Sequence, residues 1–161
     1  DYIHPRVEPE IAYLLRKPLS GRITPLDALN AVEAIAPALE IIDSRYDNFK
    51  FSLTDVVADN SSASGLVIGC WHKPDIDVSN LGLILSVNGK PREFGSTAAI
   101  LGNPIRSLVA AARMVAESGE ELPAGSVVMA GGATAAIALS PGERIELEIE
   151  KLGRASFSVV Q

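Results

Sequence analysis

The dipeptide Asn88-Gly89 stands between two stretches with strand character, residues 81–87 and 92–94. Both residues tolerate the positive φ angles of a two-residue hairpin turn, so the dipeptide is a strong signal for two adjacent antiparallel strands. Further on, acidic and apolar residues alternate over 144–150, which is typical of an antiparallel strand with one face in solvent. The second half of the chain is therefore expected to contain antiparallel sheet.

Apolar residues at helical spacing predict two principal helices. The first has Thr24-Pro25 at its start, continues through Ile35 and is ended by Pro37. The second begins at Asn103-Pro104 and ends near Gly119, with an apolar stripe between them.

The remaining stretches are short and bounded by turn residues, which favours strands. A short strand is expected within 44–51, and Thr54 is expected to cap a brief helix through Val57. We find no repeat, linker or low-complexity tract, so we expect one α+β domain over 1–161, mostly β, that ends in an antiparallel meander. The predicted strands lie at residues 4–15, 38–43, 66–70, 81–87, 92–94, 126–130, 135–139, 144–150 and 155–160.

Charge and composition exclude several classes of partner. The net charge is −6 and no cluster of Lys or Arg occurs, which argues against a nucleic-acid ligand. No apolar run is long enough to cross a bilayer, so we expect a cytoplasmic protein without membrane contact. The single cysteine, Cys70, cannot form an internal disulfide, and its apolar neighbours predict a buried core thiol rather than a reactive one.

Three acids form a candidate metal site. Glu8 and Glu10 share one face if their stretch is extended, and their Cα atoms would then lie about 7 Å apart. Pro9 between them cannot donate a ladder hydrogen bond, which indicates an edge or irregular strand. Glu40 lies in an otherwise apolar strand, where an unpaired carboxylate is costly. Three carboxylates would select Mg²⁺ or Mn²⁺ over zinc.

Spacing alone does not identify such a site. Glu146 and Glu148 have the same spacing, and we expect them to lie on a solvated strand face without a function. The acids near the N-terminus differ because His4 and Arg6 share their face, and His4 is a candidate partner of the site. On the residues alone, these acids could also be solvated or form salt bridges to Arg6 and Arg45.

Three ordered motifs resemble the fumarylacetoacetate hydrolase superfamily over nearly the whole chain. They are HPRVEPEIA at 4–12, PALEIIDSR at 37–45 and VADNSS at 57–62. More narrowly, they are similar to the branch that contains 2-hydroxypentadienoate hydratases and 4-oxalocrotonate decarboxylases. This resemblance implies a roll or barrel-like core of mixed β-sheet with two principal helices. It also implies that Glu8, Glu10 and Glu40 hold Mg²⁺ or Mn²⁺ as the catalytic centre.

Two stretches resemble the decarboxylases more than the hydratases, namely YDNFKF at 46–51 and MAGGATAA at 129–136. The implied activity is that of a lyase: metal-dependent decarboxylation of 2-oxo-3-hexenedioate to 2-hydroxypenta-2,4-dienoate in the meta-cleavage degradation of aromatic compounds. The metal would chelate the 2-keto acid end of the substrate and act as a Lewis acid. The candidates for holding substrate oxygens are Asn60, Ser62, Gly132 and Thr134, although the polar run at 59–65 is equally consistent with an ordinary turn.

Two alternatives remain open. The chain could belong to a hydratase that shares the metal and adds water to the dienoate, or to a non-catalytic subunit that binds that hydratase. The resemblance also predicts a complex with the sister hydratase, a homo-oligomer, or both. Family members carry a region before the His-Pro-Arg motif, with an active-site lysine, that this sequence does not contain. We therefore expect activity to require that region.

Overall fold

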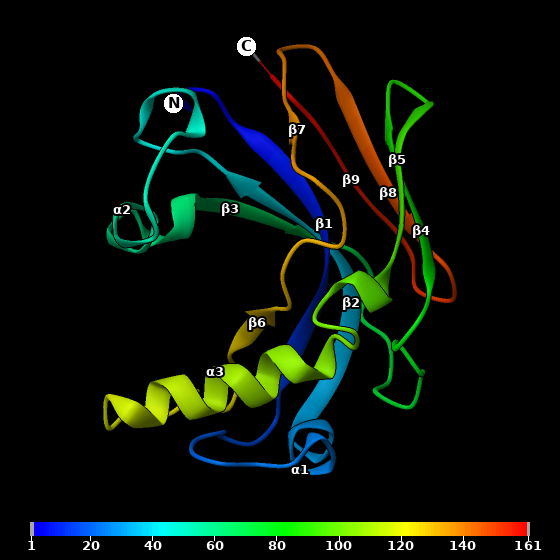
Figure 1. The fold of residues 1–161 in the computed structure, drawn as a ribbon. Coiled ribbons are helices and arrows are strands. Elements are labelled where there is room, and N and C mark those ends of the chain that lie inside the picture. The colour runs from blue at the N-terminus through cyan, green and yellow to red at the C-terminus, as the bar shows by residue number, and fades with distance from the viewer. Residues whose placement is uncertain (1, 161) are drawn as a thin grey trace.

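Two curled sheets form the framework of the computed structural model, which describes residues 2–160 (Figure 1). The first sheet has the strand order β3-β2-β1-β6, and β7 also pairs with β1. Its strands are β1 (Arg6–Leu15), β2 (Val32–Ile42), β3 (Ala63–Ile68), β6 (Val127–Met129) and β7 (Ile137–Ala138).

Strand β1 has an interrupted edge on the side away from β2. There, β7 pairs with Arg6 and Val7, and β6 pairs with 12–14. Pro9 lies in the gap between these two pairings, where its missing N–H breaks no ladder bond. The irregular strand expected at Pro9 is therefore confirmed.

The second sheet has the order β5-β4-β8-β9. Strands β4 and β5 form the predicted hairpin, with Asn88 at φ 51° and Gly89 at φ 73°. Strands β8 and β9 form a second antiparallel pair. The bounds are β4 (Gly82–Val87), β5 (Lys90–Ser96), β8 (Arg144–Ile149) and β9 (Gly153–Ser158).

One hydrophobic core is shared by the two sheets. Ile11 and Leu39 enter it from the first sheet, and Leu85 and Leu147 enter it from the second, all four fully buried. Burying one such side chain stabilises the fold by about 1.5–3 kcal/mol. Figure 1 shows the first sheet on the left and the second on the right, which together make a curled half-barrel. The mostly β, barrel-like fold is confirmed.

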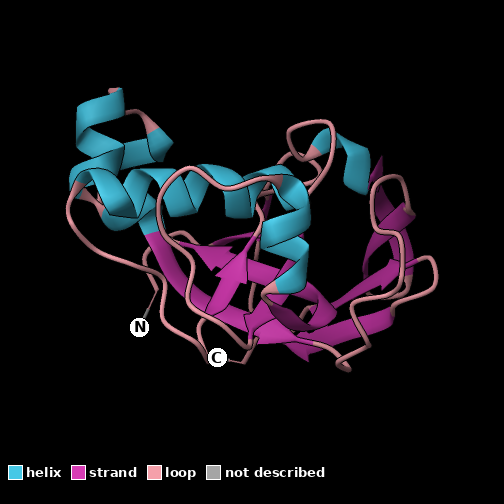
Figure 2. Cartoon of the chain, turned by 90° about the horizontal axis from the view of Figure 1, so that it is seen from below, coloured by secondary structure: helices cyan, strands magenta, loops and turns pink. Residues whose placement is uncertain are grey.

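Figure 2 shows the helices on one side of the strands, although they do not all pack together. Helix α3 (Ile105–Glu117) matches the predicted second helix and buries Leu108 and Ala112. Helices α1 (Pro25–Asn30) and α2 (Leu53–Ala58) are short. Within residues 2–160, no helix has both the length and the apolarity needed to cross a membrane.

The first predicted helix is wrong beyond residue 30. Its Thr24 cap is present, because the Thr24 side chain accepts a hydrogen bond from the Asp27 N–H in a capping box. After one turn and a half the chain leaves the helix, and Val32 and Ile35 lie in β2. Their β-branched side chains suit the pleated, buried surface of a central strand, so packing outweighed helical spacing.

Pro37 lies inside β2 and does not end an element, as the sequence had suggested. Its carbonyl accepts a hydrogen bond from the Gly69 N–H at 2.9 Å. The nitrogen of Pro37 is therefore on the β3 side of the strand, just beyond the end of β3. Its lack of a hydrogen does not affect the pairing of β2 with β1.

Several local expectations also require correction. Cys70 is exposed, not buried, because β3 ends at Ile68 and the chain leaves the sheet there. Residues 44–51 contain no strand and form a 3-10 turn at Asp47–Phe49. The brief helix exists as α2, but Ser52 caps it instead of Thr54.

The sheet pairings differ from expectation in two respects. Every strand pairing among residues 2–160 is antiparallel, so the expected mixture of parallel and antiparallel strands is not found there. Strand β7, expected to begin a C-terminal meander with β8 and β9, joins β1 in the first sheet instead. Only β8 and β9 follow that prediction.

Candidate metal centre

Glu8, Glu10 and Glu40 lie on one face of the paired strands β1 and β2. Glu8 stands directly opposite Glu40 in the antiparallel register, and Glu10 stands opposite Ala38. Because side chains alternate between the faces of a strand, all three carboxylates project to the same side. One oxygen from each lies within 4.8 Å of the others. The structure thus brings together the three acids that the sequence singled out.

A glycine loop after β6 closes against these acids. The Gly131 N–H donates a hydrogen bond to Glu10 Oε2 at 2.7 Å. A Cβ atom at Gly132 would stand 3.0 Å from Glu8 Oε2, closer than ordinary van der Waals contact. The absence of a side chain at Gly132 therefore lets the backbone approach the carboxylates.

Burial raises the free-energy cost of ionising the three carboxyl groups. Glu10 is 1% exposed, and burial raises its pKa to about 8; the Gly131 N–H opposes this rise, whereas Glu40 and Glu8 add to it. Burial is also the main cause of the raised pKa values of Glu8 and Glu40. A divalent cation would offset this cost, because its charge favours the ionised carboxylates.

No basic side chain pairs with the three glutamates in the described part of the chain. Arg45 forms its ion pair with Asp59. The Arg6 guanidinium lies over the Phe49 ring, 4.0 Å from its centroid. The salt-bridge alternative is therefore wrong for these residues. Three carboxylates without a basic partner are a donor set that fits Mg²⁺ or Mn²⁺.

Glu146 and Glu148, which repeat the spacing, have different surroundings. Arg154 lies 2.7 Å from Glu148 and 3.6 Å from Glu146. The apolar residues that alternate with them, such as Leu147, are buried. The prediction of a solvated strand face is confirmed, and the contrast shows that the buried Glu10 and the lack of a basic partner, not the spacing, distinguish the candidate site.

Asp59 has a structural role that the sequence did not indicate. It is buried, accepts hydrogen bonds from Ser62 Oγ at 3.0 Å and the Arg45 N–H at 3.1 Å, and forms an ion pair with the Arg45 guanidinium. Arg45 is the main reason that the pKa of Asp59 lies below its ordinary value. Asp59 thereby ties α2 and the following 3-10 turn (Asn60–Ser62) to the end of β2.

The four predicted substrate residues divide into two pairs. Gly132 lies beside Glu8, and the Thr134 carbonyl oxygen lies near Gly132, whereas the Thr134 hydroxyl donates a hydrogen bond to the Ala135 carbonyl at 3.1 Å. Ser62 is 2% exposed and its hydroxyl is engaged with Asp59, while Asn60 is exposed on the adjoining turn. All four substrate contacts stay predictions.

Phe49 covers the end of the β1 face that precedes the acids. Its ring centroid is 4.9 Å from the ring centroid of His4. The backbone N–H of His4 donates a hydrogen bond to Asp43 Oδ1 at 2.8 Å. His4 is thus packed beneath Phe49, and a contact with the acidic cluster stays a prediction. Sequence reasoning did not assign Phe49 a role, although its aromatic stretch was already prominent.

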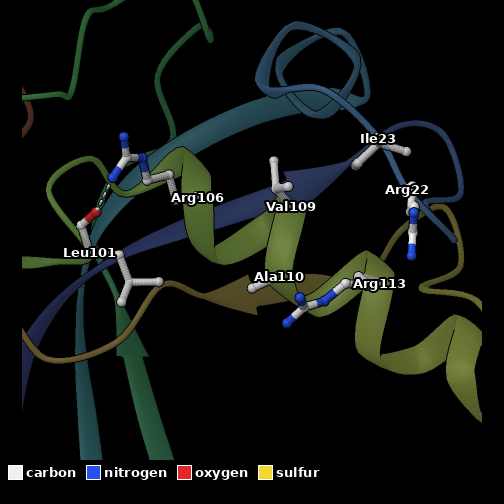
Figure 3. Close-up of a pocket in the computed structure, with 7 residues that line it drawn as sticks. All are labelled: Arg22, Ile23, Leu101, Arg106, Val109, Ala110 and Arg113. Carbon is white, nitrogen blue, oxygen red and sulfur yellow. Dashed lines mark hydrogen bonds between the residues drawn. The ribbon is translucent and has the colours of Figure 1, made fainter.

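A cavity of about 440 Å³ lies elsewhere, against α3 (Figure 3). Arg22, Arg106 and Arg113 surround an apolar surface that includes Val109. Figure 3 shows Arg106 turned toward Leu101, to whose carbonyl it donates a hydrogen bond at 3.2 Å. The lining contains no carboxylate, thiol or imidazole, so this cavity offers no ligand for a divalent cation.

Comparison of sequences identifies relatives of the chain. The family model described as fumarylacetoacetate (FAA) hydrolase C-terminal matches residues 3–160. A 4-oxalocrotonate decarboxylase from Pseudomonas sp is 64% identical over 157 residues, which cover 98% of this chain and 61% of that protein. The protein of the same name from Pseudomonas putida is 43% identical, with 98% and 61% covered. A 2-hydroxyhexa-2,4-dienoate hydratase from Comamonas testosteroni is 34% identical, with 99% and 61% covered.

Comparison of structures agrees. A 4-oxalocrotonate decarboxylase from Pseudomonas putida G7, solved with magnesium and adipate, superposes with a TM-score of 0.95 at 38% identity, covering 99% of this chain and 62% of that one. A fumarylacetoacetate hydrolase from Exiguobacterium antarcticum shares the fold at a TM-score of 0.76 and 20% identity, covering 99% and 57%. The chain spans about three-fifths of the length of the relatives that it matches.

Proposed function

Because this chain belongs to the fumarylacetoacetate hydrolase family, we propose that it forms the metal-binding part of a carboxy-lyase acting on 2-oxo-3-hexenedioate (4-oxalocrotonate). The products would be CO₂ and 2-hydroxypenta-2,4-dienoate. The observation that carries this proposal is the cluster of Glu8, Glu10 and Glu40, of which Glu10 is buried and the other two half-buried, without a basic partner. The 64% identity to a protein named 4-oxalocrotonate decarboxylase supports the choice of substrate.

Glu8, Glu10 and Glu40 would hold Mg²⁺ or Mn²⁺, in keeping with the magnesium of the related structure. When bound, such an ion supplies Lewis-acid stabilisation for the negative charge that develops on the 2-keto oxygen. In the substrate, the C5–C6 bond breaks as CO₂ leaves. Its electron pair moves through the C3–C4 double bond to that oxygen, and protonation there gives the dienol.

The residues of this chain would prepare the site in three ways. Burial of Glu10 keeps water from its carboxylate, which strengthens electrostatic interactions there. The Gly131 N–H holds Glu10 in one orientation. Gly132 keeps the space beside Glu8 open, so Gly132 and Thr134 are our leading candidates for contacts with substrate oxygens. Asn60 and Ser62 remain weaker candidates, because Ser62 is already bonded to Asp59.

A hydratase is the second candidate, since a relative of that class is 34% identical to this chain. It would use the same three acids and add water to the dienoate. Association with a sister hydratase, homo-oligomer formation and a cytoplasmic location remain parts of the proposal. We also propose that residues 1–161 form a single catalytic domain.

The reaction is tested by supplying each substrate to the Mn²⁺-loaded protein. Release of CO₂ from 2-oxo-3-hexenedioate is expected, and formation of 4-hydroxy-2-oxopentanoate from the dienoate would favour the hydratase instead. If the full-length protein forms neither product although Mn²⁺ is bound, the chain acts as a non-catalytic subunit and the proposal fails.

Glu40→Gln tests the acidic cluster. We expect CO₂ release to fall by more than about 100-fold, because even residues that only orient metal ligands are commonly worth 10- to 100-fold. Glu146→Gln is the matched control, since it removes an acid from a strand face that is solvated. Equal activity of the two variants would contradict the assignment.

A further inference from the structure

Arg6 is the only basic residue in β1 and β2, the two strands that carry the acidic cluster. It precedes Glu8 by two positions, so its side chain leaves β1 on the face of the three glutamates. It forms no ion pair with any acid among residues 2–160. A cation therefore lies beside a strongly acidic site without neutralising it.

Phe49 fixes the position of this cation. The Arg6 guanidinium carbon lies 4.0 Å from the centroid of the Phe49 ring, a geometry in which the ring face attracts the charge. Asn48 and Phe49 adopt φ angles of 57° and 54°. Left-handed backbone is unfavourable for a bulky residue and persists only where the surroundings enforce it. The strained turn thus holds the Phe49 ring against Arg6.

Charge balance shows what this arrangement can bind. Three glutamates leave the site with a net negative charge even with one divalent cation bound. A substrate that carries a second carboxylate would be repelled there unless a positive group received it. A guanidinium accommodates a carboxylate well, because its N–H groups match the two oxygens. The Cα atoms of Arg6 and Glu8 lie about 7 Å apart along the strand, a spacing comparable with the length of a six-carbon chain.

We infer that Arg6, held by Phe49, binds the distal carboxylate of a dicarboxylate substrate and selects it over monocarboxylates. This inference rests on the proposed function for the identity of the substrate. Arg6 is a specificity-determining residue, and Phe49 is a positioning residue that acts through it. Selection for the second carboxylate would separate a decarboxylase from a hydratase, whose dienoate substrate has only one.

The experiment compares two ligands of equal length on the Mn²⁺-loaded protein. Calorimetry measures the Kd of adipate, with a carboxylate at each end, and of hexanoate, with one. The wild type is expected to prefer adipate. Arg6→Met should raise the Kd of adipate by about 10- to 100-fold, the usual value of a hydrogen bond to a charged group. The Kd of hexanoate should change by less than about threefold.

Two controls make the result specific. Arg92→Met removes an exposed arginine of β5 and should leave both Kd values unchanged. The Kd for Mn²⁺ should stay within about threefold in Arg6→Met. An unchanged preference for adipate, an equal loss for both ligands, or a loss of Mn²⁺ binding would overturn the inference.

Turnover gives a second readout. The bond from Arg6 is made in the ground state and weakens as the distal carboxylate departs as CO₂, so Arg6→Met should raise KM without lowering kcat. Phe49→Leu should raise KM less, because the charge remains but is no longer positioned. Adipate binding is measured without catalysis, so this inference and the proposed reaction can fail separately.

Discussion

Glu10 is the residue at which the acidic cluster has its largest electrostatic cost. Its carboxyl group is 1% exposed, and burial raises its pKa to about 8. An isolated carboxyl group would be ionised at neutral pH, whereas the raised pKa keeps this one mostly protonated there. A site of this kind is unfavourable in an acidic chain unless a cation is recruited to it.

The stability of the metal-free protein should therefore depend on pH. Because the folded-state pKa of Glu10 is raised above its ordinary 4.5, the folded state favours the protonated form. That advantage is complete below pH 4.5 and is lost as the pH rises toward 8. We expect Tm in the presence of EDTA to fall from pH 5 to 8. Glu10→Gln, which cannot ionise, should flatten this decline, and an equal decline in the variant would contradict the cause.

Gly132 provides a test of the close backbone approach. A methyl group there would stand 3.0 Å from Glu8 Oε2, so Gly132→Ala should displace that carboxylate and weaken Mn²⁺ binding by about 10-fold or more. Gly82→Ala is the matched control, because nothing lies within 4 Å of its added methyl and it needs no positive φ. Equal Mn²⁺ affinity in the two variants would contradict a role for the close approach of the Gly132 backbone to Glu8.

At the scale of elements, Asp59 fixes the segment between β2 and β3. Its folded-state pKa lies below the ordinary 3.8, so its contribution to stability is present above that pH and is lost on acidification. Asp59→Asn should lower Tm at pH 7, because the Arg45 ion pair is lost and a buried polar network is disrupted. The difference in Tm from wild type should shrink below pH 4. A difference that stays constant with pH would contradict this account.

The sequence predicted elements well where local chemistry decides them. Asn88-Gly89 specified a hairpin, and Asn103-Pro104 marked the start of α3, because turn and cap geometry depend on neighbouring residues. Val32 and Ile35 were misread, because their spacing suits a helix and only their packing in the sheet shows a strand. The cap at Thr24 was correct, whereas the end of its helix was not.

The acidic cluster was predictable in its membership but not in its surroundings. Glu40 could be singled out because an acid in an apolar strand is unusual. The hydrogen bond from Gly131 and the stacking of Phe49 on Arg6 could not be derived, because they join segments far apart in the chain. The family resemblance was confirmed, and the geometry adds the burial that distinguishes these acids from Glu146 and Glu148.

At the scale of the whole molecule, the two sheets share a core while the three acids lie on the first sheet alone. Leu147→Ala, in β8 of the second sheet, should therefore reduce the free energy of unfolding by about 2–5 kcal/mol without changing the number of Mn²⁺ ions bound. Leu53→Ala is the control, because Leu53 is 80% exposed and its loss should change stability by less than about 0.5 kcal/mol. Urea unfolding checks both, and equal losses would contradict the assigned core.

The central claim is that Glu8, Glu10 and Glu40 together bind a divalent cation. Titration of the purified protein with Mn²⁺, followed by electron paramagnetic resonance, measures the ions bound and their Kd. We predict one tightly bound ion per chain in the wild type and in Glu146→Gln, and none in Glu10→Gln. Undiminished binding of Mn²⁺ by Glu10→Gln would contradict the account.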